Sequence, residues 1–509
     1  MKLNLLANFT GKGWTALMTF ALVPLYIGLL GVEAYGLIGF YVTLQVAFSL
    51  LDLGLSTTIN RELSRLSVLT GKEHDALDMV RSFEFLYWAM ALFIAFLIIA
   101  ISPLLAGYWI MPVNISPATV QQVIILMGIS IAAQFPYALY MGGLMGTQRQ
   151  VLCNGIDISL VTVRAVGTVL VLLLISPTVQ AFFVWQAIVN VIQTVVYAYF
   201  LYKSMPRAGY RPRFRLELLK KVWRFTAGVS GINLLAVALT QIDKVVLSKL
   251  LTLETYGIYM IASTLSSAVG MAVGPLFAAV FPRLSQMVAQ EDTAGIRELY
   301  HQCCQLMSVI ILPLAILVAI FSYPLLVAWT GDPDAAAAAA PIAALLVIGT
   351  ALNALMNIPY ALQLANGWTR LTLVMNTVAT IIIVPLVVAG ALSFGAVGAA
   401  AMWVLLNVGY VTCGMYLMHR RLLKGELARW YATDLGVPLA GAILVPLVAL
   451  LFYPGDMSRL STFAFLAILL AVSLLFTVLV TPYTRRWAST AIRALREGGV
   501  AGLIGTFTL

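Results

Sequence analysis

Residues 29–36 read LLGVEAYG, and residues 250–257 read LLTLETYG, so one pattern returns 221 positions later. Each copy follows an apolar stretch that is long enough to be a membrane helix. The tetrapeptide Pro-Tyr-Ala-Leu also occurs twice, at residues 136–139 and 359–362. Together and in order, these matches indicate the duplication of one unit. The apolar stretches between the copies predict that this unit contains six helices.

The even number of helices in the unit predicts how the two copies are arranged. Both copies enter the membrane in the same direction, so an axis along the membrane normal should relate them. Lobes of this kind enclose a central cavity that opens to alternate sides of the membrane. We therefore expect an all-α membrane protein with two six-helix, pseudo-symmetric lobes and two further C-terminal helices.

Composition places the chain in the membrane. Hydrophobic residues make up 61% of the 509 positions and charged residues only 10%, whereas soluble domains carry about 25% charged residues. Apolar stretches of about 20 residues can cross the hydrocarbon core, and lipid requires them to be helices. The fourteen expected spans are 4–30, 37–60, 82–104, 120–145, 151–175, 181–202, 225–250, 256–282, 300–328, 337–363, 369–391, 395–418, 433–453 and 460–482.

Basic residues predict the orientation of these spans, because arginine and lysine favour cytoplasmic loops. The connections after even-numbered spans, together with both termini, hold 25 of the 30 basic residues, and the connections after odd-numbered spans hold only Arg459. Both termini are therefore expected in the cytoplasm. A span too many or too few would destroy this sorting.

The net charge of +10 follows from this topology and does not indicate a nucleic-acid partner. Basic and apolar residues alternate between Arg207 and Arg224, which is typical of an interfacial helix on anionic lipid. The expected division of the chain is an N-lobe at 1–202, an amphipathic linker at 203–224, a C-lobe at 225–418, and the last two helices with the tail at 419–509.

Several motifs that would indicate an enzyme or a cofactor are absent from the sequence. The four cysteines have no metal-binding spacing, and no phosphate-binding loop of the G-x-x-x-x-G-K-[ST] type occurs. Asp332-Pro-Asp334 has the form of a metal-binding D-x-D pattern, but it precedes a run of alanines and is interpreted as a helix start. We expect no metal, no cofactor and no catalysis.

Further motifs resemble the polysaccharide-transporter branch of the MOP superfamily, which includes the flippases of O-antigen and exopolysaccharide repeat units. The stretches that carry the resemblance are Leu51-Asp52-Leu53-Gly54-Leu55, Gly146-Thr147-Gln148-Arg149, Asp243-Lys244 and Pro282-Arg283-Leu284-Ser285. The resemblance extends over almost the whole chain.

This resemblance implies a function. The substrate would be an undecaprenyl-diphosphate-linked oligosaccharide, turned from the cytoplasmic to the periplasmic leaflet of the bacterial inner membrane. An ion gradient or the consumption of the product would drive the transport. Polysaccharide polymerase and chain-length proteins would be partners.

Four basic residues lie inside expected spans, where an unpaired charge costs several kcal/mol. Lys249 lies at the outer end of its span and is expected to extend to the interface, which leaves Lys12, Arg164 and Lys244. We interpret them as the lining of a cationic substrate cavity, since a diphosphate needs positive partners once it leaves water. The alternative is that Lys12 or Arg164 forms a packing ion pair with Asp157 or Asp243.

The acidic residues of the spans suggest coupling and gating. Asp157 and Asp243 lie deepest, and either one could couple a proton to transport or could be a constant ion-pair partner. Asp243 and Lys244 point about 100° apart on a helix, so each is expected to find its partner elsewhere. Asp52 and Arg61 lie near the cytoplasmic end of the second span, as a gate or as interfacial anchors.

Three other functions remain open at this stage. A polytopic glycosyltransferase or polymerase would be expected to have a charged outer loop, and the longest one here, 105–119, has no charged residue. A multidrug or cation antiporter of the same superfamily is expected to have twelve helices and an acidic cavity. A lipid II flippase would share the architecture and is excluded only weakly.

Overall fold

The computed structural model describes residues 2–67, 69, 71–205, 210–455 and 457–490. These residues form helices and connections without a strand, apart from an isolated β-bridge between Met111 and Thr252. Twelve segments of the described chain are long and apolar enough to cross a membrane. The expectation of an all-α, multi-pass membrane protein is therefore confirmed, and the count of fourteen stays a prediction.

Two differences account for the number of segments being twelve and not fourteen. The expected spans 369–391 and 395–418 run on as one segment, Arg370–Leu422, with a break in the backbone at Gly395 (φ 60°, ψ −142°). Helix α9 (Leu216–Leu250) contains the expected span 225–250 but is not among the twelve segments.

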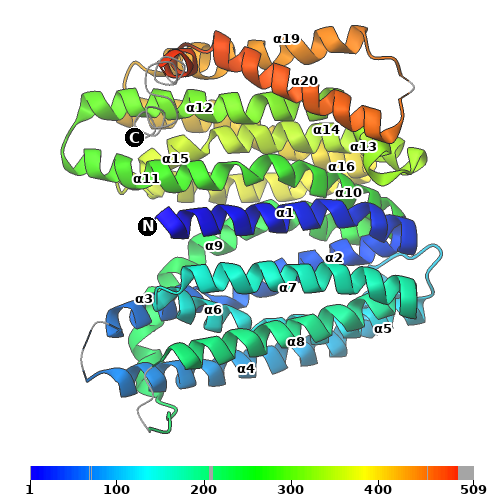
Figure 1. Cartoon of the computed structure of the whole chain (residues 1–509), viewed down its shortest axis with the longest axis vertical. Coiled ribbons are helices and arrows are strands. Elements are labelled where there is room, and N and C mark those ends of the chain that lie inside the picture. The colour runs from blue at the N-terminus through cyan, green and yellow to red at the C-terminus, as the bar shows by residue number, and fades with distance from the viewer. Residues whose placement is uncertain (1, 68, 70, 206–209, 456, 491–509) are drawn as a thin grey trace. The chain divides into compact units, whose positions relative to one another are not determined.

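The contacts between residues divide the chain into two compact units, Met1–Met260 and Ile261–Leu509. In the first unit α1 packs on α7, and α5 packs on both α4 and α8 (Figure 1). The elements of this unit are α1 (Lys2–Leu30), α2 (Val32–Ser49), η1 (Leu50–Asp52), α3 (Leu55–Leu66), α4 (Glu73–Leu104), η2 (Leu105–Trp109), α5 (Pro117–Gln134), α6 (Tyr137–Gly146), α7 (Gln150–Leu170), η3 (Val171–Ile175), α8 (Val179–Ser204), α9 and the start of α10 (Leu253–Met271).

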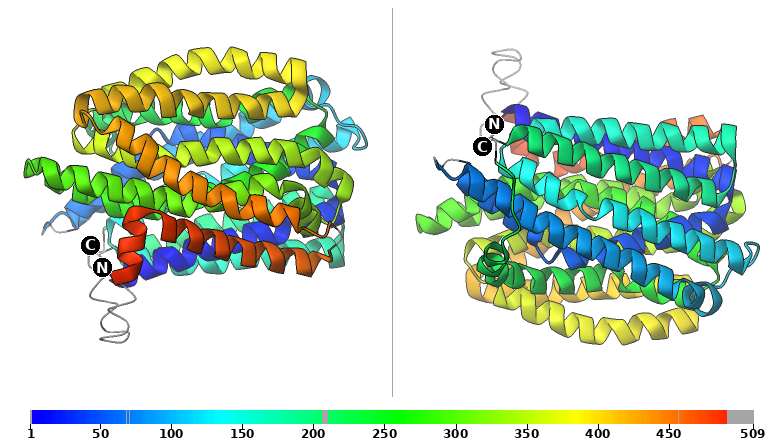
Figure 2. Two further views of the ribbon diagram at one scale, coloured as in Figure 1. Left: turned by 90° about the horizontal axis from the view of Figure 1, so that it is seen from above. Right: turned by 90° about the horizontal axis from the view of Figure 1, so that it is seen from below.

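In the second unit α12 is a central helix that contacts α11, α14, α19 and α20. The long helices of the unit run side by side (Figure 2). Its elements after α10 are α11 (Val273–Ala289), α12 (Thr293–Ile320), α13 (Ser322–Thr330), α14 (Pro333–Leu355), α15 (Asn357–Ala365), α16 (Arg370–Gly409), η4 (Tyr410–Gly414), α17 (Met415–Leu422), α18 (Leu427–Arg429), η5 (Trp430–Gly436), α19 (Val437–Leu451) and α20 (Arg459–Val480).

The two copies of the duplicated pattern touch each other at equivalent positions. A Cβ atom on Gly36 would lie 2.4 Å from the carbonyl oxygen of Leu253, and one on Gly257 would lie 2.3 Å from the carbonyl oxygen of Val32. Leu253 and Val32 are themselves equivalent in the repeat. Only glycine allows two backbones to approach so closely, which explains why both copies retain it.

The second expected span, 37–60, is not one straight helix. Helix α2 ends at Ser49, a short 3₁₀ turn follows, and α3 starts at Leu55. Between them Leu53 (φ 48°) and Gly54 (φ 77°) have left-handed backbone conformations. The prediction of a continuous helix is wrong here because hydropathy does not register two residues of left-handed backbone.

The predicted interfacial helix at 207–224 is also wrong in part. Residues 210–215 are not helical, and α9 starts only at Leu216. The reason is the fully buried Asp78 on α4, which accepts hydrogen bonds from the backbone N–H of Arg213 (2.7 Å) and from the Tyr210 hydroxyl (3.0 Å). Its carboxylate also pairs with Arg215 Nε at 2.9 Å. The connection is therefore tied to α4 as an extended strap.

Two smaller expectations concern the ends of elements. Asp332 does begin a helix, because its carboxylate accepts hydrogen bonds from the backbone N–H groups of Asp334 (3.1 Å) and Ala335 (3.0 Å), and this prediction is confirmed. The division into lobes at 202 and 225 stays a prediction. Arg207 of the predicted interfacial helix, and Arg493 and Arg496, which were counted among the basic residues of the C-terminal tail, lie outside the described residues.

Candidate functional site

Arg164 lies in the middle of α7 and is held by three side-chain amides of the neighbouring helix α8. Its guanidinium donates to Gln186 Oε1 (2.7 Å), Asn190 Oδ1 (2.7 Å) and Gln193 Oε1 (3.0 Å). The acceptors are spaced four and three residues apart, which places them on one face of α8. We call these three residues the amide clamp.

Further hydrogen bonds orient the amide clamp. Asn190 Nδ2 donates to the Ser130 hydroxyl at 2.8 Å and to the Tyr41 hydroxyl at 3.1 Å. Gln186 Nε2 donates to the Thr168 hydroxyl at 3.3 Å. With their nitrogens engaged in this way, both amides direct their oxygens to the guanidinium. Asn190 is fully buried, so this orientation is fixed within the core of the unit.

The amide clamp fixes the cation without neutralising it. Among the described residues Arg164 has no carboxylate partner within ion-pair distance. A guanidinium has five N–H donors, and the clamp occupies three. Two donors are not engaged by the clamp and the positive charge is not neutralised. A guanidinium suits a phosphate especially well.

Asp157, two turns before Arg164 on α7, does not form the ion pair that was considered for it. Its Oδ1 accepts a hydrogen bond from the Tyr197 hydroxyl at 2.6 Å. Tyr197 also donates to the backbone carbonyl of Cys153 at 3.1 Å. Asp157 therefore binds the neutral phenol of Tyr197 and does not form an ion pair with Arg164.

Lys12 lies on α1, which packs against α7. Beside it, a Cβ atom on Gly11 would come within 3.0 Å of Asn154 Oδ1, and the Trp14 indole donates to the Thr162 hydroxyl at 2.9 Å. The Lys12 side chain is exposed, and no ion pair joins it to a residue within the described ranges. Asn154, which the neighbouring Gly11 contacts, lies ten residues and about 15 Å along α7 from Arg164.

Lys244 and Asp243 pair with each other, contrary to the expectation that each needs a partner elsewhere. Lys244 Nζ lies 3.2 Å from Asp243 Oδ2, and the Tyr259 hydroxyl donates to the same oxygen at 2.5 Å. The expectation was wrong because the four-carbon stem of lysine is long and flexible enough to bring the ammonium back to its neighbour. The charge of Lys244 is thus compensated locally.

Asp52 and Arg61, the expected gate residues, are held by different partners. Asp52 accepts hydrogen bonds from the hydroxyls of Tyr87 and Ser56, the latter at 2.7 Å. It lies directly before α3 and also accepts from the backbone N–H of Ser56. Arg61 pairs with Glu62 at 2.8 Å and is half exposed. Asp52 therefore stabilises the break between α2 and α3.

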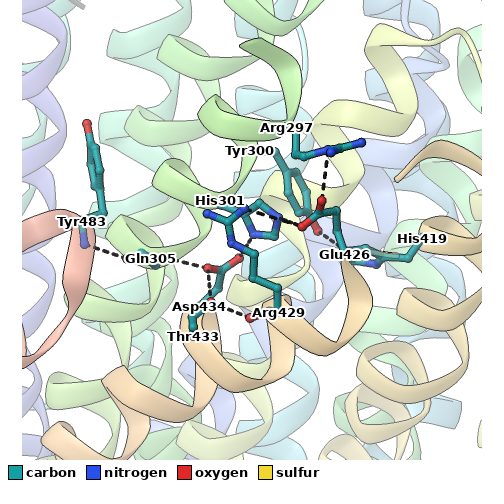
Figure 3. Close-up of polar contacts among 10 residues, drawn as sticks. All are labelled: Arg297, Tyr300, His301, Gln305, His419, Glu426, Arg429, Thr433, Asp434 and Tyr483. Atoms are coloured by element: carbon teal, nitrogen blue, oxygen red, sulfur yellow. Dashed lines mark hydrogen bonds and ion pairs between the residues drawn. The ribbon is translucent and has the colours of Figure 1, made fainter. Parts of the chain in front are cut away.

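The sequence argument missed one polar cluster, in the second unit. His301 of α12 lies between Glu426 and Asp434, which come from the start of α18 and from η5 (Figure 3). The signal was available, since His301 is one of only three histidines and Asp434 falls inside the expected span 433–453. Glu426 and Asp434 lie 125 and 133 positions after His301, so sequence spacing could not predict that the three residues meet.

Comparison with known proteins gives consistent matches. The model of a family described as "Polysaccharide biosynthesis protein" matches residues 28–333. A candidate O-antigen transporter of Shigella flexneri is 22% identical over 374 residues, which cover 74% of this chain and 87% of that protein.

Two solved structures share the fold. A structure titled as the lipid II flippase MurJ in an inward closed conformation has a TM-score of 0.72 at 13% identity, covering 94% of this chain and 98% of that one. An inward-facing multidrug resistance MATE family transporter of the MOP superfamily has a TM-score of 0.64 at 13% identity, covering 84% and 96%. At such identities the likeness establishes the fold alone.

Proposed function

Because the chain belongs to the family described as polysaccharide biosynthesis proteins, we propose that it is a flippase for an undecaprenyl-diphosphate-linked oligosaccharide. The family match confirms the resemblance to the polysaccharide-transporter branch of the MOP superfamily. In this proposal the substrate moves from the cytoplasmic to the periplasmic leaflet of the bacterial inner membrane by alternating access. Both termini lie in the cytoplasm.

The observation that carries the proposal is the uncompensated charge of Arg164. An arginine that serves only packing in a membrane helix would pair with a carboxylate, since an isolated charge in a low-dielectric medium is strongly destabilising. Here three neutral oxygens solvate the guanidinium and leave its charge intact. A diphosphate passing this point would complete the set of hydrogen bonds and compensate the charge.

The other predicted residues have unequal support for their roles. Lys12 has an exposed ammonium on the helix that packs against α7, so we retain it as a second anion contact. Lys244 would attract an anion only if its pair with Asp243 opened. We also propose that Asp157 or Asp243 couples a proton to transport. Asp52 and Arg61 would form a gate on the cytoplasmic side.

The test is transport of a fluorescent undecaprenyl-diphosphate-linked oligosaccharide in vesicles containing the purified protein. An impermeant quencher removes the fluorescence of substrate in the outer leaflet, and the lost fluorescence measures how much substrate has moved there. Arg164→Ala should reduce the rate about 10- to 100-fold, which corresponds to the loss of one or two charged hydrogen bonds. Arg164→Lys should retain part of the activity.

Lys203→Ala is the matched control, because Lys203 is a basic residue at the exposed end of α8. It should transport at the wild-type rate. Equal transport by Arg164→Ala and the wild type would contradict the role of the site. The same assay with fluorescent lipid II compares the two substrates. Faster transport of lipid II than of the oligosaccharide would favour a lipid II flippase over the proposed oligosaccharide flippase.

A further inference from the structure

The polar cluster around His301 joins α12 to the segment α18–η5. His301 Nδ1 contacts Asp434 Oδ2, and its Nε2 lies 3.1 Å from Glu426 Oε2 (Figure 3). The His301 side chain is 2% exposed, that of Asp434 is fully buried, and that of Glu426 is 14% exposed. We call these three residues the histidine cluster.

The hydrogen bonds of the histidine cluster require an additional proton. An ionised carboxylate can only accept hydrogen bonds, and a neutral imidazole donates from one nitrogen alone. Both nitrogens of His301 face carboxylate oxygens at hydrogen-bond distance. The arrangement is satisfied only if the ring carries two protons or if one of the two carboxyl groups is protonated.

The surrounding charges show which carboxylate depends on this proton. Glu426 pairs with Arg297 Nε at 3.0 Å and with Arg429 at 3.6 Å, so it has other cationic partners. Asp434 accepts from the neutral donors Gln305 (2.9 Å) and Thr433 (3.3 Å). Within the described part of the chain, His301 is the only cationic partner of Asp434.

Few other ionisable groups lie near the histidine cluster. On α12 these include Tyr300, which precedes His301 in the sequence, and Cys304, one turn further along the helix. From α17, His419 approaches Tyr300 at 3.4 Å, and its Nδ1 bonds to the Met415 carbonyl at 3.0 Å. That carbonyl can only accept, so Nδ1 carries a proton.

The other helices packed on α12 have few ionisable residues. Helix α19 has none in its sequence. The ionisable residues of the others are Arg283 on α11, Tyr323 on α13, Asp334 on α14, Tyr360 on α15 and Arg459 on α20.

We propose that His301 and Asp434 form a proton-binding site, and that the bound proton holds α18–η5 against α12. Glu426 is the route of the proton, because it contacts His301 on one side and the half-exposed Arg297 and Arg429 on the other. Loss of the proton leaves the buried Asp434 carboxylate facing an imidazole lone pair, which separates the two segments. The predicted topology places Arg297 and Arg429 on the cytoplasmic side.

The first measurement locates the proton directly. The chain has three histidines, so ¹⁵N-histidine NMR of the full-length protein in lipid vesicles gives three pairs of ring-nitrogen signals, which His74→Gln, His301→Gln and His419→Gln assign. We expect the His301 signals to be those of an imidazolium at neutral pH. If the proton lies on the carboxyl group instead, the infrared spectrum should show a band of a protonated carboxyl group that Asp434→Asn removes. A neutral His301 ring without such a band would overturn the proposal.

The second measurement follows the seam between α12 and η5 through Cys304. Its thiol is buried and lies against Trp430 of η5. In a variant that retains only this cysteine, a membrane-permeant maleimide should react at least about 10-fold faster as the pH is raised through the range in which the proton is lost. A variant that retains only Cys153, which is equally buried in the first unit, gives the increase due to thiol ionisation alone.

Two substitutions of the histidine cluster separate proton binding from packing. Asp434→Asn removes the buried charge, so Cys304 should stay protected at every pH. His301→Gln leaves Asp434 without a cation, so Cys304 should react rapidly even at low pH. The proposal would be overturned if the labelling rates of Cys304 and Cys153 rose equally with pH in the absence of these substitutions. It would also be overturned if Cys304 reacted equally fast in the Asp434→Asn and His301→Gln variants.

The consequence for transport rests on the proposed function and is measured last. Asp434→Asn should make oligosaccharide transport independent of the pH on the cytoplasmic side, whereas the wild type should slow down as that pH rises. If the protein transports another substrate, the NMR and labelling results are unaffected, so the two proposals can fail separately. Wild-type transport that is insensitive to pH would refute control by the site.

Discussion

At the level of single residues, the distinction between an amide and a carboxylate decides what Arg164 can do. The oxygen of a glutamine accepts a hydrogen bond as that of a glutamate does, but it adds no formal charge. Gln193 is the member of the amide clamp that lies 3.0 Å from the guanidinium and is 9% exposed. It has the same shape as the glutamate that would turn the site into an ion pair.

Gln193→Glu should therefore slow transport strongly while leaving the fold intact. The new carboxylate would neutralise Arg164 and repel a diphosphate, so we expect the rate to fall at least about 10-fold, with an unfolding temperature equal to or above that of the wild type. Transport in vesicles and thermal unfolding in detergent are measured on the same preparation.

Gln193→Met is the control for this prediction, because it removes the amide but adds no charge. It should retain most of the activity, since Gln186 and Asn190 still hold the guanidinium. If the methionine variant loses as much activity as the glutamate variant, the amide itself is needed and the explanation by charge fails.

The sequence identified the residues of this site better than it identified their partners. Arg164 stands out because a basic residue inside an apolar span is rare. Its partners could have been sought in the spacing of Gln186, Asn190 and Gln193, which is a polar stripe of helical period within an apolar span. The pairing of Lys244 with Asp243 could not be predicted, because it depends on a side-chain conformation and not on helix geometry.

At the level of elements, the helix starts after residues 31 and 252 are where the repeat can be tested. Gly36 and Gly257 let the first turns of α2 and α10 approach until backbone meets backbone. Gly28, at the end of α1, has no atom within 4 Å of an added Cβ. The two kinds of glycine should respond oppositely to the same substitution.

Gly257→Ala should lower the free energy of unfolding by about 1–3 kcal/mol, because its Cβ would lie 2.3 Å from the Val32 carbonyl oxygen and neither backbone can move alone. Gly28→Ala should leave stability unchanged or raise it by up to about 1 kcal/mol, since alanine favours a helix. Thermal unfolding of the purified variants measures both changes. Equal unfolding temperatures would show that the contact does not constrain the fold.

Hydropathy predicted where most helices lie but not where they break. The spans of α7 and α8 agree with the expected 151–175 and 181–202 because each is a single apolar run between polar connections. The break at Leu53 and the extended strap at residues 210–215 arise from backbone angles and from a buried carboxylate on another helix. Neither cause is visible in a hydropathy window.

At the level of the whole molecule, the sorting of basic residues predicts which loops face the cytoplasm. Arg213 lies in the strap before α9, and Arg421 stacks on Trp368 at 4.4 Å near the end of α17. Val113 and Asp334 belong to connections that the same argument places outside. Asp334 is preferred to Asp332 as a labelling site, because Asp332 caps α14.

Single cysteines at these four positions, in a chain whose own cysteines are replaced by serine, should divide into two groups. Arg213→Cys and Arg421→Cys should react with an impermeant maleimide only in inverted vesicles. Val113→Cys and Asp334→Cys should react in intact cells with a permeable outer membrane. Labelling of Arg213→Cys from the outside would overturn the orientation, and with it the direction of the proposed transport.

The amide clamp has a consequence for the effect of point mutations in the gene. Every codon for glutamine becomes a codon for glutamate by one base change, and every codon for asparagine becomes one for aspartate. Gln193 is thus a single nucleotide away from a glutamate variant that we expect to fold, to reach the membrane and to hold Arg164 in an ion pair. Such a mutant would pass an assay of abundance and fail only in transport, so genetic screens that count protein would miss it.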